Sequence, residues 1–163
     1  HPRNGSVPQV SPSPPLARRL LSVVIGASLV TLAGCSKGVE VSEGPLASNP
    51  ACQSIAALWP QTVGLQSRVD TASGAKTVAA WGDPAILARC GVEPLGPTTA
   101  ECITVDGVDW VARDFSDGVG FVTYGRTPAL EVLIPNAYAP EPMLLPAFTK
   151  AAKSLPTNGH ACV

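Results

Sequence analysis

The sequence predicts an α+β domain in which an antiparallel sheet of about five strands carries two helices on one face and is stapled by disulfides. Three observations support this fold class. Apolar and polar residues alternate between residues 108 and 134, apolar residues recur at helical spacing near residues 50–59 and 144–155, and four cysteines follow Cys35. Alternation is typical of half-buried strands, whereas helical spacing indicates an amphipathic helix that needs a surface to cover.

The first predicted helix covers residues 50–59. Asn49 is a suitable N-cap, Pro50 suits the first helical position, and Pro60 ends the segment. Residues 61–75 carry a weak pattern and are predicted to be mostly loop, with Arg68-Val69-Asp70 as a candidate short strand. Three strands are then predicted, at residues 77–81, 85–90 and 102–105.

Residues 108–134 have the clearest pattern of the chain and are predicted to form an antiparallel meander. Turn signals interrupt the alternation at Ser116-Asp117-Gly118 and at Gly125-Arg126-Thr127-Pro128, and Pro135 ends it. A final helix is predicted over residues 144–155, ending at Pro156.

An apolar run near the start of the chain resembles a bacterial lipoprotein signal. Arg18 and Arg19 precede an apolar segment over residues 20–30, and Leu32-Ala33-Gly34-Cys35 follows it. We expect residues 1–34 to be removed as a signal peptide and Cys35 to be diacylated, with palmitate among its acyl chains. The paired arginines also suggest twin-arginine export, although their flanking residues match that signal poorly.

These boundaries predict the organisation of the whole chain. Residues 35–49 are interpreted as a lipidated cysteine with a flexible tether, and residues 50–163 as a single α+β domain. The expected location is the extracytoplasmic face of the cell membrane, where the lipid on Cys35 anchors the protein.

The charge of the chain excludes one class of partner. After residue 34 the sequence holds eight lysine and arginine residues against twelve acidic residues, which gives a formal charge of −4. Nucleic-acid binding needs a basic face, so no nucleic acid is expected as a partner. We expect the membrane, through the lipid on Cys35, and an envelope protein as partners.

Four cysteines remain once Cys35 is acylated, and an oxidising compartment allows them to pair. Four cysteines permit three connectivities. We favour Cys90–Cys102, which closes a short Pro/Gly-rich segment, and Cys52–Cys162, which joins the start of the domain to its end. Metal-ligand spacing is absent from the sequence, so neither a metal nor a cofactor is expected.

Two segments combine an aromatic residue, a glycine and charged residues where a strand meets a turn. They supply Trp81, Asp83 and Arg89, and Tyr124 and Arg126. Asp83 or Arg89 is expected to lie near Arg126 because successive turns of a meander reach the same ends of a sheet. The group is interpreted as a buried structural network or, alternatively, as a small cleft whose arginine holds an anionic group.

Known catalytic motifs are missing from the sequence, and His160 is its one histidine after the signal region. This favours a non-catalytic binding or scaffold module of the cell envelope. The alternative is an envelope hydrolase or transferase with a cleft around Asp83 and Arg126, which would require perturbed carboxylates in an enclosed pocket.

Several short motifs together resemble an uncharacterised family of actinobacterial envelope proteins, domain of unknown function 3515. They are the Leu32–Cys35 motif, the stretch W-G-D-P…R-C-G-V over residues 81–92, V-D-W at 108–110, and Y-G-R at 124–126 followed by an apolar strand that ends in proline. The similarity covers residues 52–155. It implies an envelope location and a disulfide-containing α+β domain, and it implies no activity and no functional residues.

Overall fold

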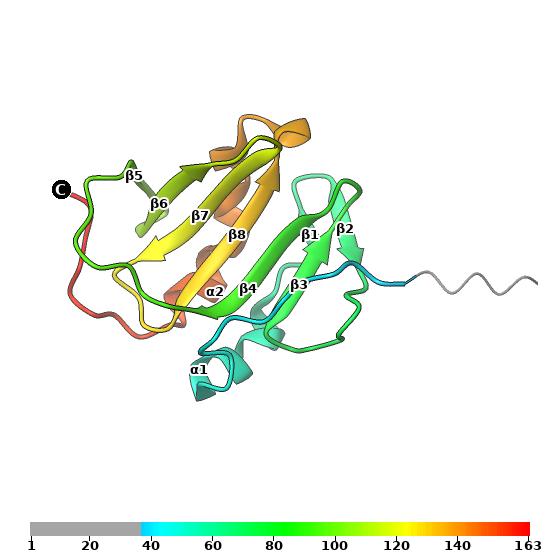
Figure 1. Ribbon diagram of the computed structural model, residues 1–163, viewed down its shortest axis with the longest axis horizontal. Coiled ribbons are helices and arrows are strands. Elements are labelled where there is room, and N and C mark those ends of the chain that lie inside the picture. Colours follow the sequence, from blue (N-terminus) through cyan, green and yellow to red (C-terminus); the bar gives the residue numbers. More distant parts are fainter. Residues whose placement is uncertain (1–36) are drawn as a thin grey trace, which may run out of the picture. The chain divides into compact units, whose positions relative to one another are not determined.

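The computed structural model describes residues 37–163, which form one antiparallel sheet of eight strands with short helical segments (Figure 1). The strands are β1 Thr62–Val63, β2 Gln66–Val69, β3 Val78–Trp81, β4 Ile86–Val92, β5 Cys102–Val105, β6 Val108–Asp114, β7 Gly118–Tyr124 and β8 Ala129–Pro135. Their order in the sheet is β1-β2-β3-β4-β8-β7-β6-β5. The chain therefore leaves β4 for the far edge at β5 and returns through the meander to pair β8 with β4.

The predicted fold class is wrong in its strand number and in its helices. The two α-helices are short, α1 with four residues and α2 with five, and 3₁₀ segments replace the rest of each predicted helix. The helical segments are α1 Pro50–Gln53, η1 Ile55–Leu58, η2 Asn136–Tyr138, η3 Glu141–Phe148 and α2 Thr149–Lys153. A proline explains why the second predicted helix is not α-helical throughout, because Pro146 lies inside η3 and lacks the N–H that an α-helix needs.

The strands β1 and β2 occupy a segment that the sequence predicted to be mostly loop, although β2 overlaps the short strand suggested at residues 68–70. Gly64, with φ of 56°, supplies the turn between them, and Thr62 pairs with Ser67. The strand β2 has no buried residue, so its sequence shows little of the alternation that marks a half-buried strand. The meander over β6, β7 and β8, by contrast, lies where the alternation predicts it.

The main core lies between the sheet and the helical segments, which all cover the same face (Figure 1). Core residues come from every strand except β2 and β5 and from both ends of the domain. The largest are Trp81, Trp110, Phe121, Phe148, Ile55, Ile86, Leu130, Ile134, Leu145 and Leu155. We call this side the covered face and the opposite side the open face.

The segment before α1, expected to be a flexible tether, lies against the open face instead. Val41 packs with Val78 and Ala80 of β3, and Figure 1 shows the segment passing beside β3 and β4 before α1. The backbone N–H of Leu46 donates to the carbonyl of Gly91 at 2.7 Å. Its two buried apolar residues, Val41 and Ala47, and its glycines thus suit a segment packed on the sheet, which the sequence pattern alone did not indicate.

All four cysteines of the domain form disulfides, as predicted, but the favoured pairing is wrong. The bonds are Cys52–Cys90 and Cys102–Cys162. Cys90 lies on β4 and Cys102 on β5, and three strands separate these two in the sheet. Neighbouring strands lie about 4.8 Å apart, so the pair is far beyond the reach of a disulfide. Cys52 lies on α1, which covers the core-facing side of β4.

The predicted signal peptide, residues 1–34, and Cys35 lie outside the described residues. Across residues 37–163, none of the helices has the length and apolar character that crossing a membrane requires.

Candidate functional site

The structure does not bring Asp83 and Arg126 together. Asp83 precedes β4 and Arg126 precedes β8, and these two strands pair antiparallel, with Val92 opposite Ala129. The start of one strand therefore lies beside the end of the other. A seven-residue strand spans about 20 Å, which separates the two turns. The expected cleft around Asp83 and Arg126 is not formed.

Arg126 binds backbone carbonyls rather than a carboxylate. Its guanidinium donates to the carbonyl oxygen of Leu155 at 2.7 Å and to that of Lys153 at 3.4 Å. These carbonyls belong to the end of α2, where a cation also interacts favourably with the helix dipole. Arg89 instead pairs with Glu131 on the open face, across β4 and β8. Arg126 therefore has a structural role at the end of α2.

The two aromatic residues of the predicted site also have separate structural roles. Trp81 is fully buried, donates its indole N–H to the carbonyl of Pro60 at 2.9 Å, and contacts Phe148 edge to face with ring centroids 5.3 Å apart. Tyr124 stacks on His160 of the C-terminal tail, with centroids 5.6 Å apart. The tail follows the β7–β8 turn closely, since a Cβ on Gly125 would lie 2.1 Å from the carbonyl oxygen of His160.

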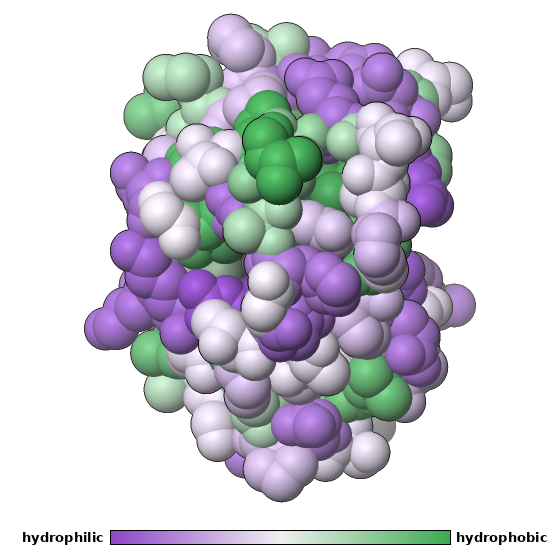
Figure 2. All heavy atoms as spheres, turned by 90° about the vertical axis from the view of Figure 1, so that its left-hand side faces the viewer, coloured by the Kyte–Doolittle hydropathy of each residue, from purple (hydrophilic) through white to green (hydrophobic). Residues whose placement is uncertain are grey.

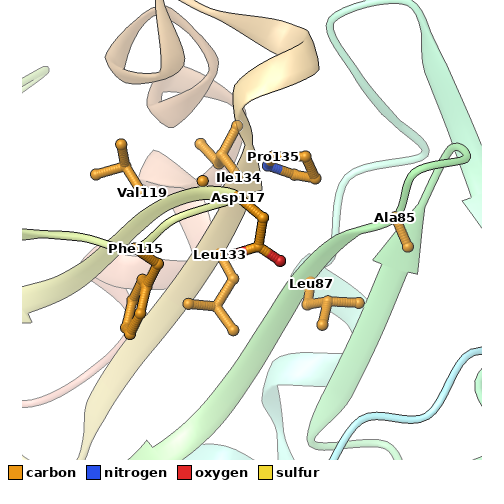
Figure 3. A pocket seen from close by; sticks show the side chains of 9 residues that line it. Ala85, Leu87, Phe115, Asp117, Val119, Leu133, Ile134 and Pro135 are labelled. Atoms are coloured by element: carbon orange, nitrogen blue, oxygen red, sulfur yellow. The ribbon is translucent and has the colours of Figure 1, made fainter.

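An apolar depression on the open face is the first candidate for a binding site. It has a volume of about 240 Å³ and lies where β4, β8 and the β6–β7 turn meet (Figure 3). We call it the sheet groove. Its lining residues are Ala85, Leu87, Phe115, Asp117, Gly118, Val119, Leu133, Ile134 and Pro135.

Phe115 and Asp117 give the sheet groove its character. Phe115 is one of the large apolar side chains that stay exposed, at 48%. Figure 3 shows Leu133 and Leu87 beside each other on the floor, with Phe115 on one side. Asp117 is the one charged residue of the lining. The groove therefore suits an apolar group that has a positive charge next to it.

Gly120 of β7 allows the Phe115 ring to lie across the sheet. A Cβ at position 120 would lie 2.8 Å from the ring of Phe115 and 3.0 Å from the end of the Leu133 side chain. Gly120 pairs with Arg113 on one side and with Leu133 on the other. The missing side chain at this position thus leaves room for two residues that line the groove, Phe115 and Leu133.

A second, larger depression lies where the described chain begins. It has a volume of about 740 Å³, and we call it the N-terminal hollow. Its polar lining residues are Gln61, Arg68, Asp70, Thr71 and Lys76, and its apolar ones include Ala56, Trp59, Val69 and Val78. Gly38 also lines it, next to the first described residue.

The face at the β5 edge is mostly hydrophilic (Figure 2). Figure 2 shows mostly hydrophilic residues there, with small separate hydrophobic groups rather than one continuous patch. Within residues 37–163, no three histidine, cysteine or acidic side chains cluster as metal ligands would. The sheet groove and the N-terminal hollow are therefore the two candidate binding sites.

Sequence reasoning missed both depressions, although one signal was available. In β4 and β8 the residues on both faces are largely apolar, for example Leu87 and Leu133 between the core positions. A strand with one solvated face normally alternates, so apolar residues at these positions indicate a second apolar surface. Phe115, an aromatic residue beside a turn, is consistent with the same interpretation.

Comparison with known proteins places the chain in a family without adding an activity. No curated protein and no solved structure is similar enough to the chain to match it. A family model described as protein of unknown function (DUF3515) matches residues 17–158, which is most of the chain. This agrees with the resemblance carried by the motifs at residues 81–92 and 124–126. The chain belongs to the DUF3515 family.

Proposed function

We propose that the protein is an extracytoplasmic lipoprotein, anchored by acyl chains on Cys35, whose domain is a non-catalytic binding module of the cell envelope. The anchor rests on the sequence Leu32-Ala33-Gly34-Cys35 after a charged and then apolar segment. The disulfides Cys52–Cys90 and Cys102–Cys162 fit an oxidising compartment.

The exposed sheet groove is the observation that carries the binding function. Leu87, Leu133 and Phe115 present apolar surface at a place where the open face has no helix over it. Surface of this kind, bordered by a charge, is typical of a protein–protein contact. We infer that the groove receives an apolar side chain of an envelope protein, with a basic residue beside it facing Asp117.

The size of the groove favours a side chain over a small-molecule substrate. Its volume of about 240 Å³ is below the range of about 300–1,000 Å³ that is usual for small-molecule sites. The groove is also open, whereas a hydrolase cleft would exclude water around its reacting groups. Asp117 has no second carboxylate in the lining with which to share acid–base work.

Labelling tests the anchor. Cys35→Ala should leave a precursor that incorporates no labelled fatty acid and keeps residues 1–34. If the variant has the same mass, label and membrane retention as the wild type, Cys35 is not the lipidation site and the anchor proposal is wrong.

Site-specific crosslinking in intact cells tests the groove. A photo-reactive phenylalanine derivative replaces Phe115 with little change in shape, and the same derivative at Lys150, exposed on α2 on the covered side, serves as the control. We expect a discrete protein adduct from position 115 that is missing from position 150. The same adduct from both positions, or none from 115, would contradict a binding role for the groove.

A further inference from the structure

The domain begins almost immediately after Cys35. The backbone N–H of Val39 donates to the carbonyl of Asp70 at 2.8 Å, and the N–H of Ala72 donates to the carbonyl of Val39 at 2.9 Å. A Cβ on Gly38 would lie 2.6 Å from the carbonyl carbon of Thr71, so the backbones are in direct contact there. Only Ser36 and Lys37 separate this attached segment from Cys35.

This short link fixes which end of the domain approaches a membrane. An extended residue spans at most about 3.6 Å, so Gly38 lies within roughly 11 Å of the Cα atom of Cys35. With acyl chains on Cys35 in the bilayer, the rim of the N-terminal hollow is held at the depth of the lipid headgroups. The sheet groove, at the β3–β4 and β6–β7 turns, has no such link to the anchor.

Basic residues outnumber acidic ones at the rim of the N-terminal hollow, whereas acidic residues outnumber basic ones in the rest of the domain. Arg68, Lys76 and Asp70 line the hollow, and Lys37 and Glu40 lie in the sequence on either side of Gly38, which also lines it. The remainder of the sequence after position 34 holds five basic and ten acidic residues. The rim is therefore the part of an acidic domain that an anionic surface attracts, within a Debye length of about 8 Å.

Two tryptophans contact the basic residues that line the hollow. The guanidinium carbon of Arg68 lies 5.3 Å from the centroid of the Trp81 ring. The indole N–H of Trp59 donates to the backbone carbonyl of Lys76 at 3.0 Å. The side chains of Arg68 and Lys76 are nevertheless exposed and line the hollow. Their charged groups are therefore free to bind an anion from outside.

We propose, on the basis of the lipid anchor proposed above, that the N-terminal hollow docks on the phosphate-bearing headgroups of anionic phospholipids. Arg68 and Lys76 take the headgroup phosphate, and Lys37 adds charge next to the anchor. The volume of about 740 Å³ has room for a headgroup, and the wall at Trp59 and Val78 is apolar. Docking at this rim orients the domain on the membrane, in addition to tethering it there.

Lysine footprinting on vesicles tests this orientation. The full lipidated protein is reconstituted into phosphatidylcholine vesicles with or without phosphatidylglycerol, and a membrane-impermeant amine reagent is applied from outside. Lys150 and Lys153 of α2, which are exposed and lie outside the hollow, are internal references. We expect the labelling of Lys76 relative to Lys150 to fall about fivefold in phosphatidylglycerol vesicles, and the protection to disappear at about 1 M salt.

A matched pair of charge reversals provides the control. Arg68→Glu should abolish the protection of Lys76, whereas Arg113→Glu, an equal charge change on β6 outside the hollow, should leave it unchanged. Protein that stays on the vesicles but labels Lys76 equally in both lipids would overturn headgroup docking while leaving the anchor standing. Protein that carries no fatty acid and is not retained would overturn the anchor itself.

Discussion

Gly44 and Gly91 meet backbone to backbone. A Cβ added to Gly44 would lie 2.4 Å from the carbonyl carbon and oxygen of Gly91, and one added to Gly91 would lie 2.4 Å from the backbone nitrogen of Ala47. Gly91 has φ of 95° and occupies the irregular step in β4, where the pairing with β8 shifts. This contact attaches the segment before α1 to the centre of the sheet.

The first prediction concerns this contact. Gly44→Ala should lower the free energy of unfolding by about 1–3 kcal/mol, because the new methyl group meets backbone atoms that have nowhere to move. Gly96→Ala is the matched control, since nothing lies within 4 Å of a Cβ there. Urea unfolding with an unchanged slope measures both variants. Equal midpoints for the two would show that the segment is not part of the cooperative unit.

The disulfide pairs give a second prediction. Peptide mapping of the unreduced protein should join Cys52 to Cys90 and Cys102 to Cys162, with sequence separations of 38 and 60 residues. Closing loops of these lengths stabilises by about 4 kcal/mol each in the chain-entropy model. Replacing both cysteines of either pair with alanine should cost that order of stability. Peptides that join Cys90 to Cys102 would refute the strand order of the sheet.

The third prediction concerns Arg126. Arg126→Ala should destabilise the domain by about 1–2 kcal/mol, because the carbonyls of Lys153 and Leu155 lose their donor at the end of α2. Asp83→Ala, at an exposed turn position, should change stability by less than about 0.5 kcal/mol. Thermal unfolding decides between this assignment and a shared network, which would make the two losses similar.

The meander was predictable from the sequence because one of its faces is buried along most of its length. Positions such as Trp110, Phe121 and Val132 face the core while their neighbours face outward, and Gly at the turns allows the chain to reverse. The strand β2 appeared in the sequence only as a short candidate at residues 68–70, because no residue in it is buried. Alternation of apolar and polar residues marks a strand with one buried face. A strand without buried residues therefore has no such pattern in its sequence.

The candidate site failed for a topological reason. Trp81-Gly-Asp83 and Tyr124-Gly-Arg126 look alike locally, and in a simple meander their turns would share an end of the sheet. The excursion of the chain from β4 to the far edge at β5 changes this order, so β4 meets β8 in the antiparallel sense. The same excursion separates Cys90 on β4 from Cys102 on β5, so the predicted bond between them is wrong. Strand order depends on contacts between distant segments, which one sequence does not display.

A fourth prediction concerns Gly120, whose missing side chain leaves room for the Phe115 ring. Gly120→Ala should displace the ring of Phe115 and the end of Leu133, both of which are free to move, and so narrow the sheet groove. We expect a loss of stability below about 1 kcal/mol together with a clear fall in the yield of the position-115 adduct. A normal adduct yield in a folded variant would show that the binding surface lies elsewhere.

The charge at the rim of the groove tests the proposed contact most directly. Asp117 lines the groove, whereas Asp114, three residues earlier, is also exposed and does not line it. The measurement is the yield of the position-115 adduct in intact cells carrying Asp117→Lys or Asp114→Lys. A basic residue facing Asp117 would be repelled by the lysine, so the yield should fall about fivefold or more in Asp117→Lys and stay at the wild-type level in Asp114→Lys. Equal yields in the two variants would contradict a partner that places a positive charge beside the groove.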